Sequence, residues 1–150
     1  MARYHNIFGP EGTWDGGREK APAALCGKIA LSTNGTIEMW GDGLQTRSFV
    51  PLIDACVEGA TRLLCSNVKV PVNIGSDEMV SINGLAGIIA DIAGKKIEIN
   101  HISGPHGVRG RNSDNALINK LLGWAPSQPL RAGLERSYEW IERQAMRDDD

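Results

Sequence analysis

Two arginines in a glycine-rich loop are the residues of this chain best suited to chemistry with phosphate groups. Arg109 and Arg111 flank Gly110 within residues 104–115, Gly-Pro-His-Gly-Val-Arg-Gly-Arg-Asn-Ser-Asp-Asn. A guanidinium keeps its charge at any physiological pH, and its fork of donors matches paired phosphate oxygens. The loop therefore indicates a clamp for a diphosphate, although the Arg-Gly-Arg triplet alone also fits a solvated basic turn.

The segments on either side of this loop favour the clamp. Residues 97–101 alternate apolar and polar side chains, which predicts a strand, and residues 115–122 have the pattern of a helix. Proteins of the α/β class place ligands where a strand ends in a loop before a helix. We therefore expect an α/β fold with Arg111 at its ligand site.

The composition fits one domain over residues 1–150 and excludes several classes of partner. The 150 residues are 41% hydrophobic and carry a formal net charge of −2, so general binding to nucleic acid is not expected. No segment reaches the roughly 18 apolar residues of a membrane span, and no signal pattern begins the chain, so we expect a cytoplasmic protein. Cys26, Cys56 and Cys65 lack metal-ligand spacing, which predicts small buried residues rather than disulfides or a metal site.

Strands and helices are predicted to alternate along the chain. Gly41-Asp42-Gly43 is typical of a turn, and it predicts a hairpin between strands at 37–40 and 45–50. In the helix expected at 52–64, one face should hold Ile53, Cys56, Val57, Ala60, Leu63 and Leu64. Other strands are expected at 2–8 and 71–75, and other helices from Lys20 to before Asn34, from the Ser81 N-cap to about Ala93, and along the stripe Leu134, Tyr138, Ile141 and Ala145.

Two further patterns are assigned to structure rather than to chemistry. Gly84, Gly87 and Ala90 have the spacing of a dinucleotide fingerprint, but they lie inside the helix predicted after Ser81, where close helix packing explains them better. His101 and His106 have no serine or cysteine partner at a recognisable spacing, which favours structural or surface histidines. The chain also contains no Tyr-x-x-x-Lys.

Six segments together carry a family resemblance. They are residues 2–10, 17–22 (Gly-Arg-Glu-Lys-Ala-Pro), 39–49 (which contains Trp-Gly-Asp-Gly), 72–76, 109–111 and 122–126. Over nearly all of its length the chain resembles the C-terminal half of an extended short-chain dehydrogenase/reductase, a family of NAD-dependent nucleotide-sugar epimerases and dehydratases. The resemblance implies a small mixed α/β substrate-binding lobe, with the Rossmann domain absent from this chain.

The resemblance also implies a role for individual residues. Lys20 would be the catalytic residue that moves protons at the sugar once a ketone at C4 has acidified the neighbouring carbons. By their types and positions alone, Lys20 could equally be an exposed first-turn lysine, Arg47 a strand-surface arginine and Lys28 a solvated helix lysine. The full set of substrate-binding residues that the resemblance implies is Asn6, Glu19, Lys20, Ala21, Lys28, Gln45, Thr46, Arg47 and Arg111.

The remaining parts of such an enzyme would lie before Met1. In the family, NAD is held by an N-terminal Rossmann domain that also supplies a Tyr-Lys pair and a catalytic cysteine, whereas Cys26 stands where the family has a structural cysteine. The expected partners are a nucleotide sugar such as GDP-mannose and either a separate Rossmann half or a second copy, with self-association expected around Tyr4, Ile7 and Phe8.

Two other features of the resemblance bear on the structure and the function. Residues 49–56 depart from the family by a one-residue insertion and a proline, so an altered strand-to-helix junction is expected. Three functions stay open: the substrate half of an isomerase, a non-catalytic nucleotide-sugar-binding or interaction module, and an inactive gene fragment.

Overall fold

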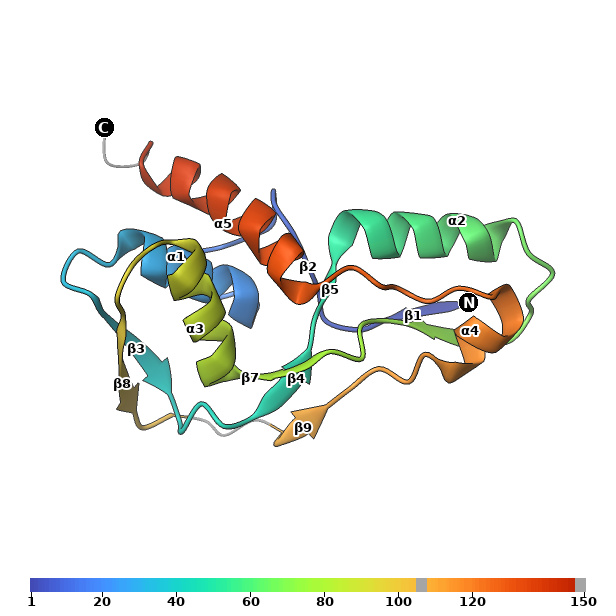
Figure 1. Ribbon diagram of the computed structural model, residues 1–150, viewed down its shortest axis with the longest axis horizontal. Coiled ribbons are helices and arrows are strands. Elements are labelled where there is room, and N and C mark those ends of the chain that lie inside the picture. The colour runs from blue at the N-terminus through green and yellow to red at the C-terminus, as the bar shows by residue number, and fades with distance from the viewer. Residues whose placement is uncertain (105–107, 148–150) are drawn as a thin grey trace.

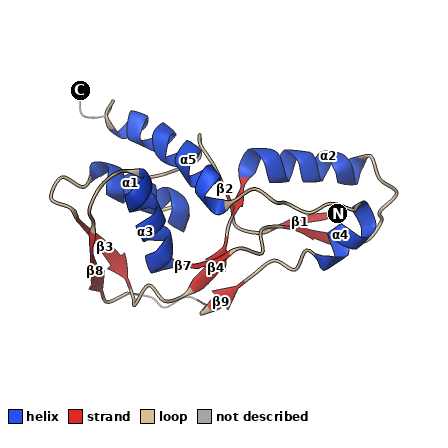
Figure 2. Cartoon of the chain, in the orientation of Figure 1, coloured by secondary structure: helices blue, strands red, loops and turns tan. Residues whose placement is uncertain are grey.

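The computed structural model describes residues 1–104 and 108–147, with the backbone alone at residues 52–54. Helices make up most of the regular structure (Figures 1 and 2). They are α1 (Ala21–Leu31), the π-helical segment η1 (Leu52–Val57), α2 (Glu58–Leu64), α3 (Ile82–Ile92), α4 (Ala116–Leu122) and α5 (Leu130–Ala145). The described residues contain no helix that is long and apolar enough to cross a membrane.

The strands are short, and in the part of the chain that the structure describes they form four small sheets. They are β1 (Ala2–Tyr4), β2 (Ile7–Phe8), β3 (Thr36–Trp40), β4 (Thr46–Ser48), β5 (Val50–Pro51), β6 (Val72–Ile74), β7 (Met79–Ser81), β8 (Glu98–Ile102) and β9 (Gly110–Arg111). The pairs β1–β6, β2–β5 and β3–β8 are parallel. In the three-stranded sheet, β4 lies between antiparallel β7 and parallel β9. The expected mixed α/β fold is confirmed.

The predicted hairpin is wrong, because β3 and β4 belong to different sheets. β3 pairs along its whole length with β8, and β4 pairs with β7 and β9. Gly41 and Gly43, with φ of 74° and 66°, turn the chain out of the first sheet. The backbone N–H of Gly41 still donates to Ile102 of β8 at 2.9 Å. The turn residues therefore join two sheets instead of closing one ladder.

Helices α1, α3 and α5 pack together over the larger core (Figure 1). The predicted stripe of α5 is confirmed, since Leu134, Tyr138, Ile141 and Ala145 are all buried. The N-cap of α3 is also confirmed, because the Ser81 hydroxyl accepts a hydrogen bond from the Gly84 N–H at 3.0 Å. At the start of α5, the Leu130 N–H donates to the Glu78 carboxylate at 2.8 Å, which satisfies one of the open donors of that helix.

Phe8 belongs to this larger core rather than to an exposed patch. It is buried and meets Phe49 edge to face, with ring centroids 6.3 Å apart. Of the three residues expected on a self-association surface, only Tyr4 is exposed, since Ile7 is half-buried. That expectation is therefore wrong for Phe8.

The altered junction at residues 49–56 takes the form of the π-helical segment η1 before α2. A π-type turn accommodates one extra residue inside a helix, which matches the apparent insertion. It also rotates the residues that follow, so the predicted apolar face is wrong in part: Cys56 and Gly59 are buried, whereas Val57 and Leu64 are 62% and 85% exposed.

The cysteines differ from one another in exposure. Cys26 and Cys56 are buried, as expected, and Cys65 is exposed at the end of α2, so that part of the prediction is wrong. All three are free thiols.

Lys95, which follows α3, closes the end of α1. Its ammonium group donates to the carbonyl oxygens of Ile29 and Ala30 at 2.8 and 2.7 Å. Hydrogen bonds from a charged group contribute about 1.5–3 kcal/mol, and these bonds satisfy carbonyls that the helix leaves open.

Replacing Lys95 with methionine keeps the aliphatic stem and removes these donors. We expect Lys95→Met to lower the free energy of unfolding by about 1–2 kcal/mol in urea denaturation. Lys96→Met is the matched control, because Lys96 is exposed, and it should change stability by less than about 0.5 kcal/mol. Equal losses in the two variants would contradict the capping role of Lys95.

Candidate functional site

A cavity of about 330 Å³ brings together five of the nine predicted substrate-binding residues. It lies between the β1–β2 connection, the start of α1, β4 and the start of α3. Its predicted members are Asn6, Lys20, Ala21, Gln45 and Arg47, and Phe49 and Ile82 complete the lining. Segments separated by up to 76 positions (Asn6 to Ile82) thus meet at one hollow that combines polar and apolar walls.

Asn6 enters the cavity through an unusual backbone conformation. Its φ is 43°, in the left-handed region that asparagine tolerates better than most residues. The side-chain amide donates to the Ser48 carbonyl at 2.9 Å, and the Asn6 carbonyl accepts from Val50 at 3.2 Å. These bonds fix Asn6 against β4, while one amide hydrogen remains for a ligand.

The alternation of a strand decides which side chains from residues 45–49 enter the cavity. Gln45, Arg47 and Phe49 line it, whereas Thr46 does not. Successive side chains of a strand point to opposite faces. Backbone hydrogen bonds from the start of α3 hold residues 43–45 in place. The Ile82 N–H donates to the Gln45 carbonyl at 3.1 Å, and the Asn83 N–H donates to the Gly43 carbonyl at 3.0 Å.

Two of the predicted guanidinium groups stand in adjacent strands. Arg47 of β4 is the register partner of Arg111 of β9, so their side chains leave the same face of the sheet. Arg47 donates to the carbonyl of Thr46 at 2.7 Å. Within the described residues, neither arginine forms a salt bridge with a carboxylate. The pair is therefore a local concentration of positive charge without a neutralising acid.

The neighbouring Arg109, unlike Arg47 and Arg111, is paired with a carboxylate. It forms a salt bridge with Asp42 at 2.9 Å, and its carbonyl accepts from the Thr46 N–H at 2.8 Å. The other carboxylate oxygen of Asp42 accepts from the Leu44 N–H at 3.0 Å, and the Asn83 amide donates to the Asp42 carbonyl at 3.0 Å. Asp42 and Asn83 thus position the turn before Gln45, a role that sequence patterns did not predict.

Lys20, just before α1, lines the cavity, and Glu19 precedes it in the chain but lines neither this cavity nor the larger pocket beside it. Lys20 is the N-cap residue, and within residues 1–104 and 108–147 no side chain caps this helix. Glu19 is half-buried, and its Oε2 atom is buried without a hydrogen-bond partner in that part of the chain. A buried carboxylate oxygen without a partner is costly.

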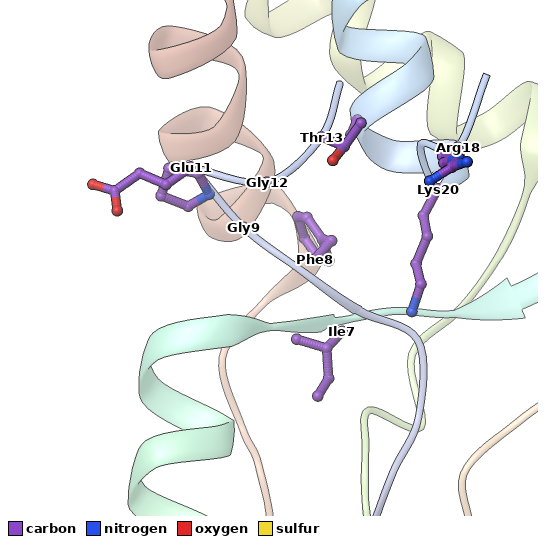
Figure 3. A pocket seen from close by; sticks show the side chains of 10 residues that line it. Ile7, Phe8, Gly9, Glu11, Gly12, Thr13, Arg18 and Lys20 are labelled. Carbon is purple, nitrogen blue, oxygen red and sulfur yellow. The ribbon is translucent and has the colours of Figure 1, made fainter. Parts of the chain in front are cut away.

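Lys20 also lines a second, larger pocket of about 500 Å³ (Figure 3). That pocket is walled by the loop that follows β2 and by Phe8, Arg18 and Ala23. In Figure 3 the Lys20 side chain extends from the start of α1 toward the strand-bearing side of the pocket. The Lys20 ammonium group therefore stands between two hollows.

Lys28 lies apart from this arrangement. It is exposed in the last turn of α1, where its ammonium group donates to the Glu38 carbonyl of β3 at 2.7 Å. It lines neither of the two cavities around Lys20. The structure thus places Lys28 in a contact between α1 and β3.

The buried thiols are unsuited to nucleophilic chemistry. Burial raises the pKa of the Cys26 thiol to about 12 and that of the Cys56 thiol to about 11. The reactive form of cysteine is the thiolate, so both side chains stay protonated at neutral pH. This agrees with the structural assignment of Cys26.

The remaining motifs occupy structural positions. His101 makes a 2.7 Å hydrogen bond through Nδ1 with the Gly41 carbonyl, and His106 lies outside the described residues. Gly84 and Gly87 lie within α3, as expected, so they do not form the strand-to-helix turn that holds a dinucleotide. Close packing does not explain Gly87, since a Cβ atom there would meet nothing within 4 Å. The described residues thus offer no glycine turn that fits NAD at this motif.

Comparison with solved structures defines the class of protein. The chain superposes on UDP-glucose 4-epimerase from Thermotoga maritima with a TM-score of 0.84 at 24% identity, covering 95% of this chain and 45% of that one. For the UDP-glucuronic acid 4-epimerase from Bacillus cereus, solved in complex with UDP-glucuronic acid and NAD, the TM-score is 0.81 at 27% identity, with the same coverage. No protein-family model matches the chain. The fold is that of the C-terminal part of extended short-chain dehydrogenase/reductase epimerases.

Within this class, the chain is homologous to the C-terminal part of GDP-mannose 3,5-epimerase. It is 60% identical over 144 residues to the protein from Arabidopsis thaliana, which covers 96% of this chain and 38% of that protein. A dTDP-4-dehydro-6-deoxy-D-allose reductase from Streptomyces is 35% identical over 141 residues, with 42% of its length covered. The family resemblance is confirmed, and the chain spans less than half of the length of these relatives.

The register of the two arginines generates a stability prediction. Like charges opposite each other in a sheet cost about 0.2–1 kcal/mol, so Arg111→Met should raise the free energy of unfolding by that amount at low salt. Arg109→Met is the matched control, since it removes the same charge together with the salt bridge to Asp42, and it should not stabilise. Thermal melts of both variants at low and at high salt measure the change in stability and its dependence on salt. A stabilising effect of equal size in the two variants would contradict the proximity of Arg47 and Arg111.

Proposed function

We propose that this chain is the substrate-binding half of a nucleotide-sugar epimerase that acts on GDP-mannose, with residues 1–150 as one lobe. The observation that carries the proposal is the cavity where Asn6, Lys20, Ala21, Gln45 and Arg47 meet. The 60% identity to GDP-mannose 3,5-epimerase supports the choice of substrate. Solved relatives bind UDP-glucose and UDP-glucuronic acid, which supports the broader class of nucleotide sugars.

In this proposal, different side chains of the lobe bind different parts of the substrate. Arg47 and Arg111 bind the diphosphate, because paired guanidinium groups without a carboxylate partner complement two adjacent phosphates. Gln45 and Thr46 lie against the nucleotide, and Asn6 offers its remaining amide hydrogen on the diphosphate side. Lys28, tied to the Glu38 carbonyl, would need to leave that contact to reach a phosphate.

The sugar would lie at the start of α1. There the unpartnered carboxylate oxygen of Glu19 accepts a hydroxyl group, and Ala21 contacts the ring. NAD, held by the N-terminal domain that this chain lacks, would supply the oxidation of the sugar at C4. Lys20 would hold or deliver a proton at the carbon next to the carbonyl, which is the contribution of a general acid–base residue.

The chain alone is therefore catalytically incomplete, and we propose that a Rossmann half completes it, either covalently or as a separate polypeptide. The Bacillus cereus relative was solved in complex with UDP-glucuronic acid and NAD, and this lobe covers 45% of that chain. The three free cysteines support the reducing cytoplasm as its compartment.

A non-catalytic module that binds nucleotide sugars is the second candidate. It is favoured by the fact that all residues proposed to bind the diphosphate and the sugar belong to this lobe, five of them at one cavity, so binding would persist without turnover. An inactive gene fragment would show neither binding nor turnover of a nucleotide sugar. Binding by the lone chain separates the fragment from the other two functions, and turnover after restoration of the missing half separates the enzyme from the module.

The first test is calorimetric titration of GDP-mannose into the chain. Arg111→Ala should weaken binding by roughly tenfold to a hundredfold, because a charge-assisted diphosphate contact is worth about 1.5–3 kcal/mol. Arg143→Ala, an exposed charge on α5, is the matched control and should bind like the wild type. Equal affinities for wild type and Arg111→Ala would assign Arg111 to a solvated turn.

The second test concerns Lys20 in a fusion with the N-terminal part of the Arabidopsis thaliana relative. Lys20→Ala should reduce hydrogen–deuterium exchange at the sugar and epimer formation by about 10²- to 10⁴-fold, with binding changed far less. Lys20→Arg should not restore either, because a guanidinium keeps its proton. An active Lys20→Arg variant, or equal losses of binding and turnover in Lys20→Ala, would make Lys20 a positioning charge.

A further inference from the structure

The pocket of about 500 Å³ beside the substrate cavity has no role in the proposed function, apart from the Lys20 side chain that the two hollows share. Its volume is within the range of about 300–1,000 Å³ that is typical of sites for small molecules. Apolar side chains from β2, from the loop at residues 9–13 and from α1 line it, together with two cationic groups. This combination indicates a ligand that is partly apolar and negatively charged.

Packing holds the walls of this pocket in place. Phe8 is buried and fixed by α5, because a Cβ atom at Gly133 would lie 2.9 Å from the Phe8 ring. The loop at residues 9–13 leads directly into Trp14, whose ring packs so closely on α1 that a Cβ atom at Gly27 would lie 2.9 Å from it. The pocket is therefore preformed, which lowers the cost of ordering its walls when a ligand binds.

The charged residues of the lining leave an excess of positive charge. Within residues 1–104 and 108–147, neither Arg18 nor Lys20 forms a salt bridge. Glu11 is the acidic residue of the lining. Figure 3 shows Arg18 and Lys20 on the side of the pocket where α1 begins, whereas the Glu11 carboxylate lies on the other side and points away from the hollow. The interior of the pocket thus complements an anion.

We propose that this pocket is a binding site for an organic carboxylate, held by Arg18 and Lys20 with its apolar part against Phe8 and Ala23. The guanidinium fork matches the two oxygens of a carboxylate. The apolar walls favour an anion with an apolar body over a small, strongly hydrated ion such as inorganic phosphate. Arg47 and Arg111, the groups proposed to bind the diphosphate, do not line this pocket.

The shared lysine couples this site to the substrate cavity. Lys20 lines both hollows, and its one ammonium group cannot make its closest contacts in both at the same time. A carboxylate beside Arg18 would hold that ammonium group in the larger pocket. In the proposed function Lys20 moves a proton at the sugar, so a bound organic acid would oppose turnover. This consequence rests on the proposed function, whereas the carboxylate site does not depend on it.

The test titrates benzoate, a carboxylate on an apolar ring, into the full chain at low salt and follows the backbone amide resonances by NMR. The amides of Gly9, Gly12 and Thr13, which line the pocket, should shift as benzoate binds. The amide of Gly94, which follows α3 and lies outside the lining, should not. Benzyl alcohol, which has the ring without the charge, and inorganic phosphate, which has the charge without the ring, should both bind more weakly than benzoate.

Substitution of the two cationic residues identifies the groups that hold the carboxylate. Arg18→Gln and Lys20→Gln should each weaken benzoate binding by roughly threefold to tenfold, as expected for the loss of a partly solvated charge pair. Arg143→Gln, which removes an exposed charge of α5, is the matched control and should bind like the wild type. Glu11→Gln should not weaken binding, because its carboxylate points away from the pocket. The same NMR spectra show whether each variant is folded.

Several results would overturn the inference. They are equal benzoate affinities of the wild type and Arg18→Gln, an affinity for benzyl alcohol or phosphate as high as that for benzoate, and unshifted amides at residues 9–13 up to the solubility limit of benzoate. An unchanged affinity in Lys20→Gln would also overturn it, because the proposed site needs both cationic groups. None of these results bears on the proposed function, since the titration of GDP-mannose with Arg111→Ala tests the substrate site separately.

Discussion

The hydrogen-bonded register of β4 between β7 and β9 is the constraint on which the site depends. One neighbour brings Arg111 level with Arg47, and the other leads directly into α3, which places Ile82 at the cavity. The alternation of side chains along β4 then sends Gln45 and Arg47 inward. A shift of one residue in this register would reverse the two faces. The lobe therefore fixes the turn before β4 with several hydrogen bonds, from Asn83, Arg109 and the Asp42 carboxylate.

This arrangement favours ligand binding at some cost in stability. Two arginines in register place like charges on adjacent strands, and within the described residues one buried oxygen of Glu19 lacks a hydrogen-bond partner. In the proposed function, a ligand with phosphate and hydroxyl groups would offset both costs. By contrast, Lys95 and Glu78 satisfy helix ends in the part of the lobe that only supports the cavity.

The molecule also has two unequal cores. The one under α1, α3 and α5 is built from side chains of many elements, whereas the one beside β1 and β6 has only a few buried residues. The cavity connects them, because Asn6 follows β1 and Lys20 begins α1.

The sequence by itself determined the class of fold, most element positions and a set of site residues, because helix caps, apolar stripes and motif types are local signals. Ser81 as an N-cap and the stripe of α5 are examples. Only the tertiary structure decided that Gly41 and Gly43 link two sheets, since strand pairing depends on partners such as β8 that are distant in the chain. It also decided which of the predicted residues line the cavity. Glu19, Lys28, Thr46 and Arg111 do not, although Arg111 is the register partner of Arg47, because side-chain direction follows from register and packing, which no local pattern encodes.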